Sequence, residues 1–251
     1  MSDNNSAPRP TTVLITGANK GLGLEAARRL GLMGWTVFLG SRDEARGQAA
    51  VDKLAADGVT AILVPLDVTS DESAAAAARL VTEHTDRLDV LINNAGAPGG
   101  IVPPADATVA DLHEVYDTNV YGPVRVTHAF LPLLQAADHP RVVMVSSGGG
   151  SFAVVTDPEQ RVSKMHELAY SSSKAALNMI TVRYAQALPH IKFNVATPGE
   201  VANRKFTATD MNHHTGELTV TEGTDPIIRL ATLDPDGPTG VFVDRLGPVA
   251  W

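Results

Sequence analysis

The segment TGANKGLG, residues 16–23, stands between a short apolar run at residues 13–15 and a helix-forming stretch at residues 24–30. This order describes a strand that turns tightly into a helix. Backbone N–H groups at such a helix start have no partner within the helix and carry positive partial charge, so a phosphate fits against them. Glycine allows the tight turn and leaves no Cβ between the backbone and a pyrophosphate. A tight turn without a ligand is the alternative, because the spacing Gly-x-x-x-Gly-x-Gly differs from the commoner dinucleotide-binding pattern.

Apolar strand-like runs alternate with helical patterns along the chain. The predicted strands are residues 12–16, 36–40, 60–66, 90–93, 141–146, 192–197 and 241–243. The predicted helices are residues 23–33, 44–57, 71–84, 111–136 with a break near Pro123, 169–188 and 221–232. The strands are short and apolar without strict alternation, as expected where helices cover both faces of a parallel sheet. We therefore predict an α/β fold: one doubly wound domain over residues 11–251, with about seven parallel strands and ligands beyond their carboxyl ends.

Composition limits the classes of function. The 251 residues carry a formal net charge of −8 and no cysteine. This balance argues against a nucleic-acid partner, and the lack of cysteine excludes disulfides and thiolate ligands. The sequence predicts no metal site. Residues 1–10 are polar and contain proline, so we expect a disordered N-terminal tail, and no apolar run is long enough to indicate a membrane partner. A cytoplasmic location is the expectation.

Two basic residues stand where a nucleotide would meet the predicted sheet. Lys20 lies inside the glycine-rich turn, and Arg42 follows the second predicted strand, after Ser41. An acidic residue usually occupies the latter place when the ribose has no 2′-phosphate. Lys20 and Arg42 together favour a 2′-phosphate, which a guanidinium contacts with its planar fork and an ammonium as a point charge. Alternatively both are ordinary solvated cations, with Asp43 or Glu44 as the partner of Arg42.

The third and fourth predicted strands end in small or polar residues. Asp67 and Val68 follow the third strand, where an adenine would lie. The alternative is that Asp67 or Ser70 caps the next helix. The sequence Asn-Asn-Ala-Gly at residues 93–96 follows the fourth strand and leaves room for a ribose, although as a bare turn signal it would mean little.

The fifth predicted strand and the helix after it contribute hydroxyl and amine groups. Ser146 and Ser147 end the strand. Tyr170 and Lys174 are four residues apart in a predicted helix and therefore share one of its faces. A lone Tyr-x-x-x-Lys pair is usually a surface feature, so its meaning depends on a serine hydroxyl and a cofactor site beside it.

Taken in order, these motifs resemble the short-chain dehydrogenase/reductase family from residue 12 to about residue 243. The resemblance is carried by Thr-Gly-x-x-x-Gly-x-Gly at 16–23, Asp67, Asn-Asn-Ala-Gly at 93–96, Asn119, Ser147, Tyr170-x-x-x-Lys174 and Pro198-Gly199. Asn19-Lys20 and residues 41–50 look most like the NADPH-dependent carbonyl reductases and their plant menthone- and salutaridine-reducing relatives.

The resemblance implies a Rossmann-type fold and four catalytic residues. Tyr170 would be the acid/base, Lys174 its activator and a holder of the nicotinamide ribose, Ser147 the ligand of the carbonyl oxygen, and Asn119 the anchor of a proton-relay water. The implied cofactor is NADP(H). The residues expected to contact it are Gly17, Asn19, Lys20, Gly21, Leu22, Gly23, Ser41, Arg42, Asp67, Val68, Asn94, Ala95, Gly96, Tyr170, Lys174, Pro198, Gly199 and Val201.

Physical chemistry supports an acid/base role for Tyr170. A phenol has an ordinary pKa of about 10, and a lysine cation about 5 Å away contributes roughly 3 kcal/mol at an effective dielectric constant near 20. We therefore expect Lys174 to lower the pKa of Tyr170 toward neutrality. Tyr170 would protonate a developing alkoxide while Ser147 donates a hydrogen bond to the same oxygen. Ser146 is the alternative serine, although its side chain should point to the other face of the strand.

Two segments depart from the common family pattern. Residues 152–168 lengthen the interval between Ser147 and Tyr170 and resemble, in shorter form, the inserted segment of the carbonyl-reductase branch. That insertion tends to block helix-to-helix dimerisation, so monomer and homo-oligomer both stay open. Residues 200–221 stand where the family has a mobile substrate lid. In this lid Asn203 is a candidate contact of the nicotinamide amide, and the pair His213-His214 is expected at the surface. Candidates for the substrate side, with core or surface positions as the alternative, are Tyr121, Phe152, Met165 and Phe206.

The sequence thus predicts an oxidoreductase that transfers hydride from NADPH to a ketone or aldehyde carbonyl of a small molecule, with Tyr170 as general acid. One alternative is an NAD-dependent alcohol dehydrogenase running in the oxidative direction. Another is a sensor that binds NADP(H) without turnover, which loss of Tyr170 or Lys174 would have favoured.

Overall fold

The computed structural model describes residues 9–100 and 102–251 and contains a seven-stranded sheet in the order β3-β2-β1-β4-β5-β6-β7. All neighbouring strands are parallel. The doubly wound fold predicted from the sequence is therefore confirmed. The strands are β1 (Thr12–Ile15), β2 (Thr36–Ser41), β3 (Ala61–Pro65), β4 (Val90–Asn93), β5 (Arg141–Val145), β6 (Lys192–Ala196) and β7 (Phe242–Val243).

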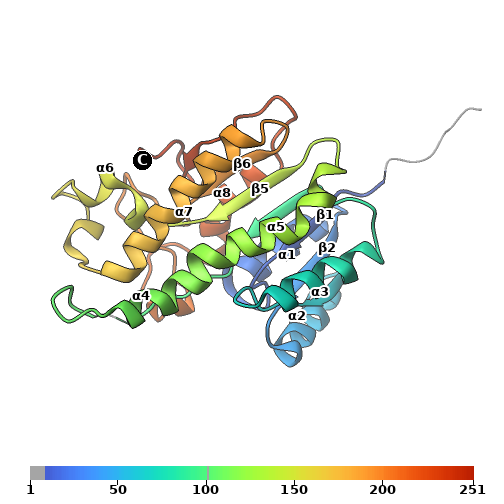
Figure 1. Ribbon diagram of the computed structural model, residues 1–251, viewed down its shortest axis with the longest axis horizontal. Coiled ribbons are helices and arrows are strands. Elements are labelled where there is room, and N and C mark those ends of the chain that lie inside the picture. The colour runs from blue at the N-terminus through green and yellow to red at the C-terminus, as the bar shows by residue number, and fades with distance from the viewer. Residues whose placement is uncertain (1–8, 101) are drawn as a thin grey trace, which may run out of the picture.

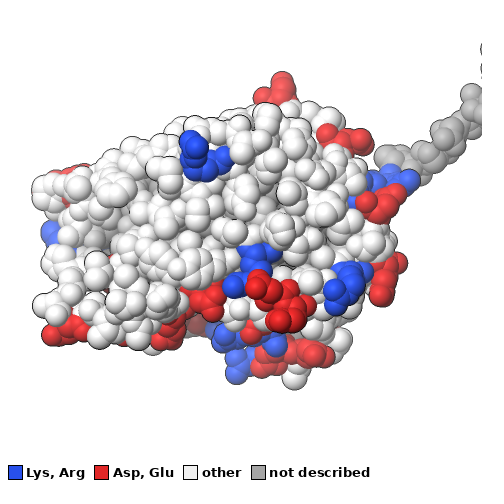
Figure 2. Space-filling model, viewed as in Figure 1, with Lys and Arg blue, Asp and Glu red and all other residues white. Residues whose placement is uncertain are grey.

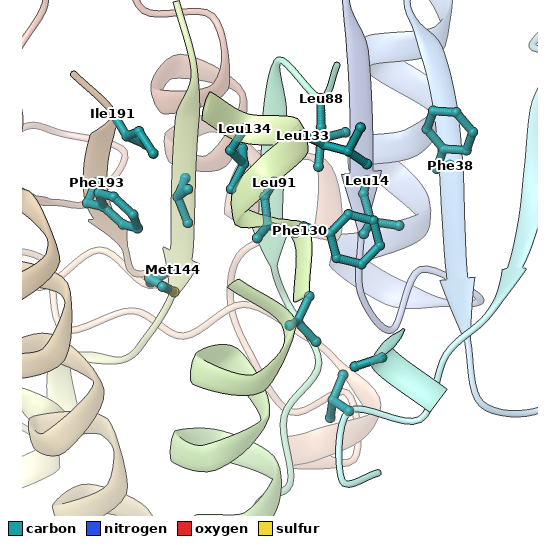
Figure 3. Packing of buried hydrophobic residues seen from close by; sticks show 14 of the residues in the cluster. Leu14, Phe38, Leu88, Leu91, Phe130, Leu133, Leu134, Met144, Ile191 and Phe193 are labelled. Carbon is teal, nitrogen blue, oxygen red and sulfur yellow. The ribbon is translucent and has the colours of Figure 1, made fainter. Parts of the chain in front are cut away.

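Helices cover both faces of the sheet because residues along each strand point alternately to the two sides. The larger helices are α1 (Gly21–Leu32), α2 (Glu44–Ala56), α3 (Asp71–Thr82), α4 (Val109–Tyr116), α5 (Gly122–Gln135), α7 (Leu168–Ala187) and α8 (Val220–Ala231). Leu14 and Phe130 belong to the cluster under α3, α5 and α7, whereas Val13 and Ile15 pack under α1, α2 and α8. Figure 1 shows the layer formed by α3, α5 and α7, and Figure 3 shows the packing beneath it.

The strand order of the sheet reverses its direction at β1. Val13 lies between Val37 of β2 and Val90 of β4, so the chain winds outward in both directions from this strand. A crevice at the carboxyl ends of the strands is expected at such a reversal. The glycine-rich segment 16–23 follows β1 at that point.

The predicted break near Pro123 is a π-helical turn, η1 (Asp117–Tyr121), between α4 and α5. Pro123 itself stands in the first turn of α5, where its missing N–H costs nothing. The wider π turn carries Asn119, which is 0% exposed. Single-turn π segments are frequent at functional sites because they reorient side chains within an otherwise regular helix.

Segment 152–168 folds into the short helix α6 (Phe152–Val155) and the turn η3 (Val162–Lys164). The C-terminal end of the chain lies beside α6, where Ala153 donates its backbone N–H to the Trp251 carbonyl (Figure 1). The sequence did not predict α6, because a single helical turn has no amphipathic period long enough to recognise.

Charged side chains are unevenly distributed on the face seen in Figure 2, which carries a broad uncharged area and a mixed acidic and basic group at its lower edge. Of the predicted tail 1–10, residues 1–8 lie outside the described residues, and Arg9 pairs with Asp86 at 2.9 Å. Among the described helices, none has the length and apolar character needed to cross a bilayer.

Candidate active site

A cavity of about 640 Å³ opens at the carboxyl ends of the central strands. Its wall contains the predicted residues Gly17, Asn19, Lys20, Gly21, Leu22, Arg42, Asp67, Val68, Asn94, Ala95, Gly96, Ser147, Tyr170, Lys174, Pro198, Gly199 and Val201. Residues spread over most of the sequence therefore meet in one site. Gly23, Ser41 and Asn119 are not part of the wall.

The glycine-rich turn is fastened to the end of β4. Asn94 donates its side-chain N–H groups to the carbonyl oxygens of Thr16 at 2.9 Å and Gly17 at 3.1 Å. In return, the Thr16 hydroxyl accepts hydrogen bonds from the Asn94 and Ala95 backbones. Gly17 has a φ of +61°, a left-handed conformation that favours glycine. Two predicted motifs thus form a single unit whose shape their backbones determine.

The beginning of α1 has the features of a phosphate site. No side chain caps this helix, so its first N–H groups remain available to a ligand. Gly23 explains the close packing behind the turn, since a Cβ there would lie 2.6 Å from the Asn94 amide nitrogen and 2.8 Å from the Gly17 carbonyl oxygen. The donors and the glycine-lined approach fit the pyrophosphate of a dinucleotide.

The far end of the cavity combines Arg42 with Asp67. The pKa of Asp67 is held below its usual range, first by the Thr69 backbone N–H and also by the positive charge of Arg42. Ser70 caps α3, so Asp67 is not needed for that purpose. Ser41 is 1% exposed and donates its hydroxyl to the Asp43 carbonyl, which explains its absence from the wall.

Lys20 does not lie free beside Arg42. Its ammonium pairs with Asp210 at 2.5 Å, across the cavity from the glycine-rich turn. His214 holds the other oxygen of that carboxylate at 2.8 Å. Arg42, by contrast, has no carboxylate within 4.0 Å in the described part of the chain.

Ser147, Tyr170 and Lys174 come together in the cavity. Ser147 begins the turn η2 (Gly148–Gly150) at the end of β5, lines the cavity together with Tyr170, and its side chain lowers the pKa of Tyr170. Lys174 lies one helical turn beyond Tyr170, with its Nζ 5.7 Å from the centre of the tyrosine ring. Ser146 instead directs its hydroxyl toward the Lys174 carbonyl at 3.5 Å. The geometry therefore favours Ser147 over Ser146 as the partner of Tyr170.

The titration behaviour of Tyr170 differs from the sequence expectation. Burial raises the pKa of Tyr170 to about 12, against the opposing hydrogen bond from Ser147, and the Glu167 carboxylate raises it further. Burial also lowers the pKa of Lys174 to about 8. The expected lowering of the tyrosine pKa was wrong for the protein without a bound cofactor, because burial raises this pKa more than the Ser147 side chain lowers it.

Asn119 is enclosed by its own hydrogen bonds. Its amide donates to the Ala97 carbonyl at 2.9 Å and to the Ser173 hydroxyl at 3.0 Å, and its oxygen accepts from the Ala97 backbone at 2.8 Å. The side chain thus ties the segment after β4 to α7, the helix that carries Tyr170. This arrangement positions neighbouring groups, and the role of Asn119 as the anchor of a proton-relay water stays a prediction.

Comparison with known proteins identifies the family. The short chain dehydrogenase model matches residues 11–216. The chain belongs to the short-chain dehydrogenase family. A curated relative in Saponaria officinalis, short-chain dehydrogenase/reductase 1, is 35% identical over 92% of this chain and 93% of that protein. The (+)-neomenthol dehydrogenase of Arabidopsis thaliana is 33% identical, covering 94% of this chain and 96% of that protein.

Solved structures of short-chain dehydrogenases share this architecture. The NADPH-bound carbonyl reductase from chicken fatty liver superimposes with a TM-score of 0.83 and 31% identity, over 97% of this chain and 100% of that one. The salutaridine reductase of Papaver somniferum gives a TM-score of 0.78 and 28% identity, over 92% and 99% of the two chains. Membership of the short-chain dehydrogenase family makes this protein an oxidoreductase of a family that uses nicotinamide cofactors.

The part of the cavity away from the glycine-rich turn is lined by two segments of this short-chain dehydrogenase. Segment 152–168 and segment 200–221 both contribute to its wall, with an apolar group formed by Val154, Val162, Met165, Phe206 and Met211. Of the substrate-side candidates, Met165 and Phe206 line the cavity, whereas Phe152 and Tyr121 are 72% and 45% exposed and lie outside the wall. Arg161 lies 4.8 Å from the Phe206 ring centre and pairs with Glu217 at 2.9 Å, linking the two segments.

Several wall residues of this short-chain dehydrogenase were not singled out from the sequence. Asn203 lies outside the cavity wall and donates to the Glu200 carboxylate at 2.7 Å, and its contact with the nicotinamide amide stays a prediction. Glu167, Asp210 and Met211 do line it. Glu167 could have been predicted from the sequence, because a residue three positions before Tyr170 lies on the same face of the helix.

Proposed function

We propose that this protein is an NADPH-dependent reductase of ketone or aldehyde carbonyls. The observation that carries the proposal is the placement of Ser147 and Tyr170, with Lys174 on the next turn of α7, in the same cavity as the glycine-rich turn. The carbonyl reductase from chicken binds NADPH, as the name of its structure states, and supports the choice of reaction by similarity alone.

Each proposed group has a defined task. Bound NADPH supplies the hydride that the carbonyl carbon receives. Tyr170 gives its proton to the carbonyl oxygen as negative charge develops there, and Ser147 donates a hydrogen bond to that same oxygen. A tyrosine pKa of about 12 keeps Tyr170 protonated at neutral pH, which suits an acid. Lys174 donates its Nζ to the Val145 carbonyl at 3.0 Å, a bond that fixes the ammonium beside Tyr170.

The proposed cofactor preference rests on Arg42. The end of β2 presents this guanidinium to the cavity, and among the described residues no carboxylate neutralises it within 4.0 Å. An ionised 2′-phosphate would supply that missing partner. Lys20 would join it only after exchanging Asp210 for the phosphate. We also propose that segment 200–221 acts as a lid, since its residues face the glycine-rich turn across the cavity.

Spectroscopic assay with a panel of ketones and aldehydes tests the proposal. We expect NADPH oxidation by the wild-type protein, a loss of about 10²–10⁴-fold in kcat/KM for Tyr170→Phe, and unchanged NADPH affinity by calorimetry. Tyr184→Phe is the matched control on α7, because that ring stacks on Phe193 at 4.9 Å and does not line the cavity. Tight NADPH binding with no turnover of any carbonyl would favour the sensor, and faster alcohol oxidation with NAD would favour the dehydrogenase alternative.

A further inference from the structure

Glu167 places a carboxylate on the same side of α7 as the proposed catalytic residues. It is the residue at the N-cap of α7, three positions before Tyr170 and seven before Lys174, a spacing that forms one stripe on a helix. It lines the cavity and acts electrostatically on the Tyr170 hydroxyl. A ligand whose carbonyl oxygen meets Tyr170 would therefore have its neighbouring atoms beside Glu167.

Among the described residues, the Glu167 carboxylate has no ion-pair partner and caps no helix. It makes no capping hydrogen bond to α7, and in the described ranges no lysine, arginine or histidine nitrogen lies within 4.0 Å of it. The residue is half-buried, and burial raises its pKa. The positive end of the α7 dipole acts in the opposite direction and favours the ionised carboxylate. A partly desolvated carboxylate without a partner is costly, so a cationic ligand group would be stabilised there.

Two arginines on the substrate side of the cavity already have acidic partners. Arg161 pairs with Glu217 at 2.9 Å, and Arg204 lies 3.6 Å from Glu159. Among the described residues, Glu167 is thus a carboxylate near Tyr170 without an ion-pair partner, and the neighbouring Lys174 ammonium donates to the Val145 carbonyl instead. The same wall contains apolar side chains, which suit a hydrocarbon skeleton.

We propose that Glu167 determines substrate specificity by binding a protonated amine, so that the preferred substrates are ketones or aldehydes with an apolar skeleton and an ammonium group a few bonds from the carbonyl. This inference rests on the proposed reductase function and specifies its substrate class. The ammonium donates to the Glu167 carboxylate while the carbonyl oxygen accepts from Ser147 and Tyr170. Charge-assisted hydrogen bonds of this kind are stronger than neutral ones and select by charge as well as by position.

Two ketones of equal shape test the proposal. The first, 5-(dimethylamino)pentan-2-one, is protonated at neutral pH, and the second, 6-methylheptan-2-one, replaces its nitrogen by carbon. We expect the wild-type protein to prefer the amine by about tenfold in kcat/KM, mainly through KM, which corresponds to about 1.4 kcal/mol. Glu167→Gln should abolish this preference, and Glu167→Asp should keep part of it. The ratio of the two substrates cancels any change in the acidity of Tyr170, because both use the same proton donor.

Asp157→Asn is the matched control, since Asp157 lies in the same segment, outside the cavity wall and without an ion pair among the described residues, and it should retain the preference. An equal ratio in wild type and Glu167→Gln would overturn the inference while reduction of the neutral ketone leaves the proposed function standing. Calorimetry of the amine binding to the NADP-loaded protein gives a readout without turnover. Equal affinities of wild type and Glu167→Gln in that titration would also overturn the inference, even if neither ketone were reduced.

Discussion

Gly150, next to the wall residues Gly148 and Gly149, and Asp210, in the wall itself, illustrate two ways in which the cavity is built. At Gly150 the turn η2 approaches α7 so closely that an added Cβ would lie 2.6 Å from the Lys174 carbonyl carbon. At Asp210 the contact across the cavity is an ion pair with Lys20 in which both side chains are more than half exposed. The contact at Gly150 is held by close backbone packing, whereas the contact at Asp210 depends on a charge attraction that water and salt weaken.

The close-packed side carries the groups proposed for chemistry. The Asn178 amide donates to the Gly150 carbonyl at 3.0 Å, and the buried Lys174 donates to the Val145 carbonyl. Segment 200–221 differs, since Arg204, His213 and His214 there have left-handed φ values that cost a non-glycine residue energy. Proton transfer needs atoms fixed within tenths of an ångström, while substrate admission needs a segment that can rearrange. We therefore expect the close packing of η2 on α7 to determine the type of reaction, and segment 200–221 to determine substrate specificity.

The largest effect is expected from adding one methyl group on the close-packed side. Gly150→Ala should lower the free energy of unfolding by about 3 kcal/mol, because backbone atoms of α7 must move to admit the Cβ. Its kcat/KM should fall with it, since η2 and α7 carry Ser147 and Tyr170. Chemical denaturation and steady-state assay measure both. Gly148→Ala is the control, where the new Cβ would meet Val201 at an ordinary 3.4 Å. Equal stability of the two variants would contradict the close packing.

A smaller effect should follow from the buried charge of Lys174. Its folded pKa of about 8 lies below the ordinary 10.5, so between these values the unfolded chain holds a proton that the folded one lacks. Stability should therefore rise with pH in this window, by about 2 kcal/mol from pH 8 to pH 9.5. Urea denaturation at both pH values should show the rise in wild type but not in Lys174→Met. Parallel pH profiles of the two proteins would disprove the shift.

Substitution of Arg42 tests whether a single charge in the cavity wall determines the choice between NADPH and NADH. Arg42→Ala should weaken NADPH binding by about tenfold, the loss expected for hydrogen bonds to a charged group, and should leave NADH binding nearly unchanged. Calorimetry with both cofactors measures the difference. Arg46→Ala is the control, because Arg46 pairs with Asp43 at 3.3 Å and does not line the cavity. A similar loss for both cofactors would exclude recognition of the 2′-phosphate.

The smallest effect is expected at the exposed pair Lys20–Asp210. Asp210→Asn should release Lys20 and strengthen NADPH binding by about twofold to fivefold, because exposed ion pairs contribute at most ~1 kcal/mol. High salt should remove the gain. Glu217→Gln, which breaks the pair with Arg161 instead, should not strengthen binding. Weaker NADPH binding by Asp210→Asn would show that Asp210 supports the site and does not compete for Lys20.

Much of the fold could be predicted because its signals are local. The glycine spacing at 16–23 and the short apolar runs specified a strand, a tight turn and a parallel sheet, and all seven strands were found within about two residues of their predicted places. The brief turns α6, η2 and η3 were missed, since four residues or fewer show no helical period. The break near Pro123 was placed correctly, but its cause is the π turn before the proline.

The sequence by itself determined the doubly wound fold, and most of the site residues predicted from it line the cavity, because such a sheet collects successive strand ends at one edge. Only the tertiary structure decided which charges are paired. Lys20 forms an ion pair with Asp210, which lies 190 positions later. The Asn119 amide donates to Ala97 and Ser173. Glu167 has no cationic partner among the described residues. The tertiary structure also reversed the expected pKa shift of Tyr170. Burial and pairing depend on contacts between distant segments, and no local pattern records them.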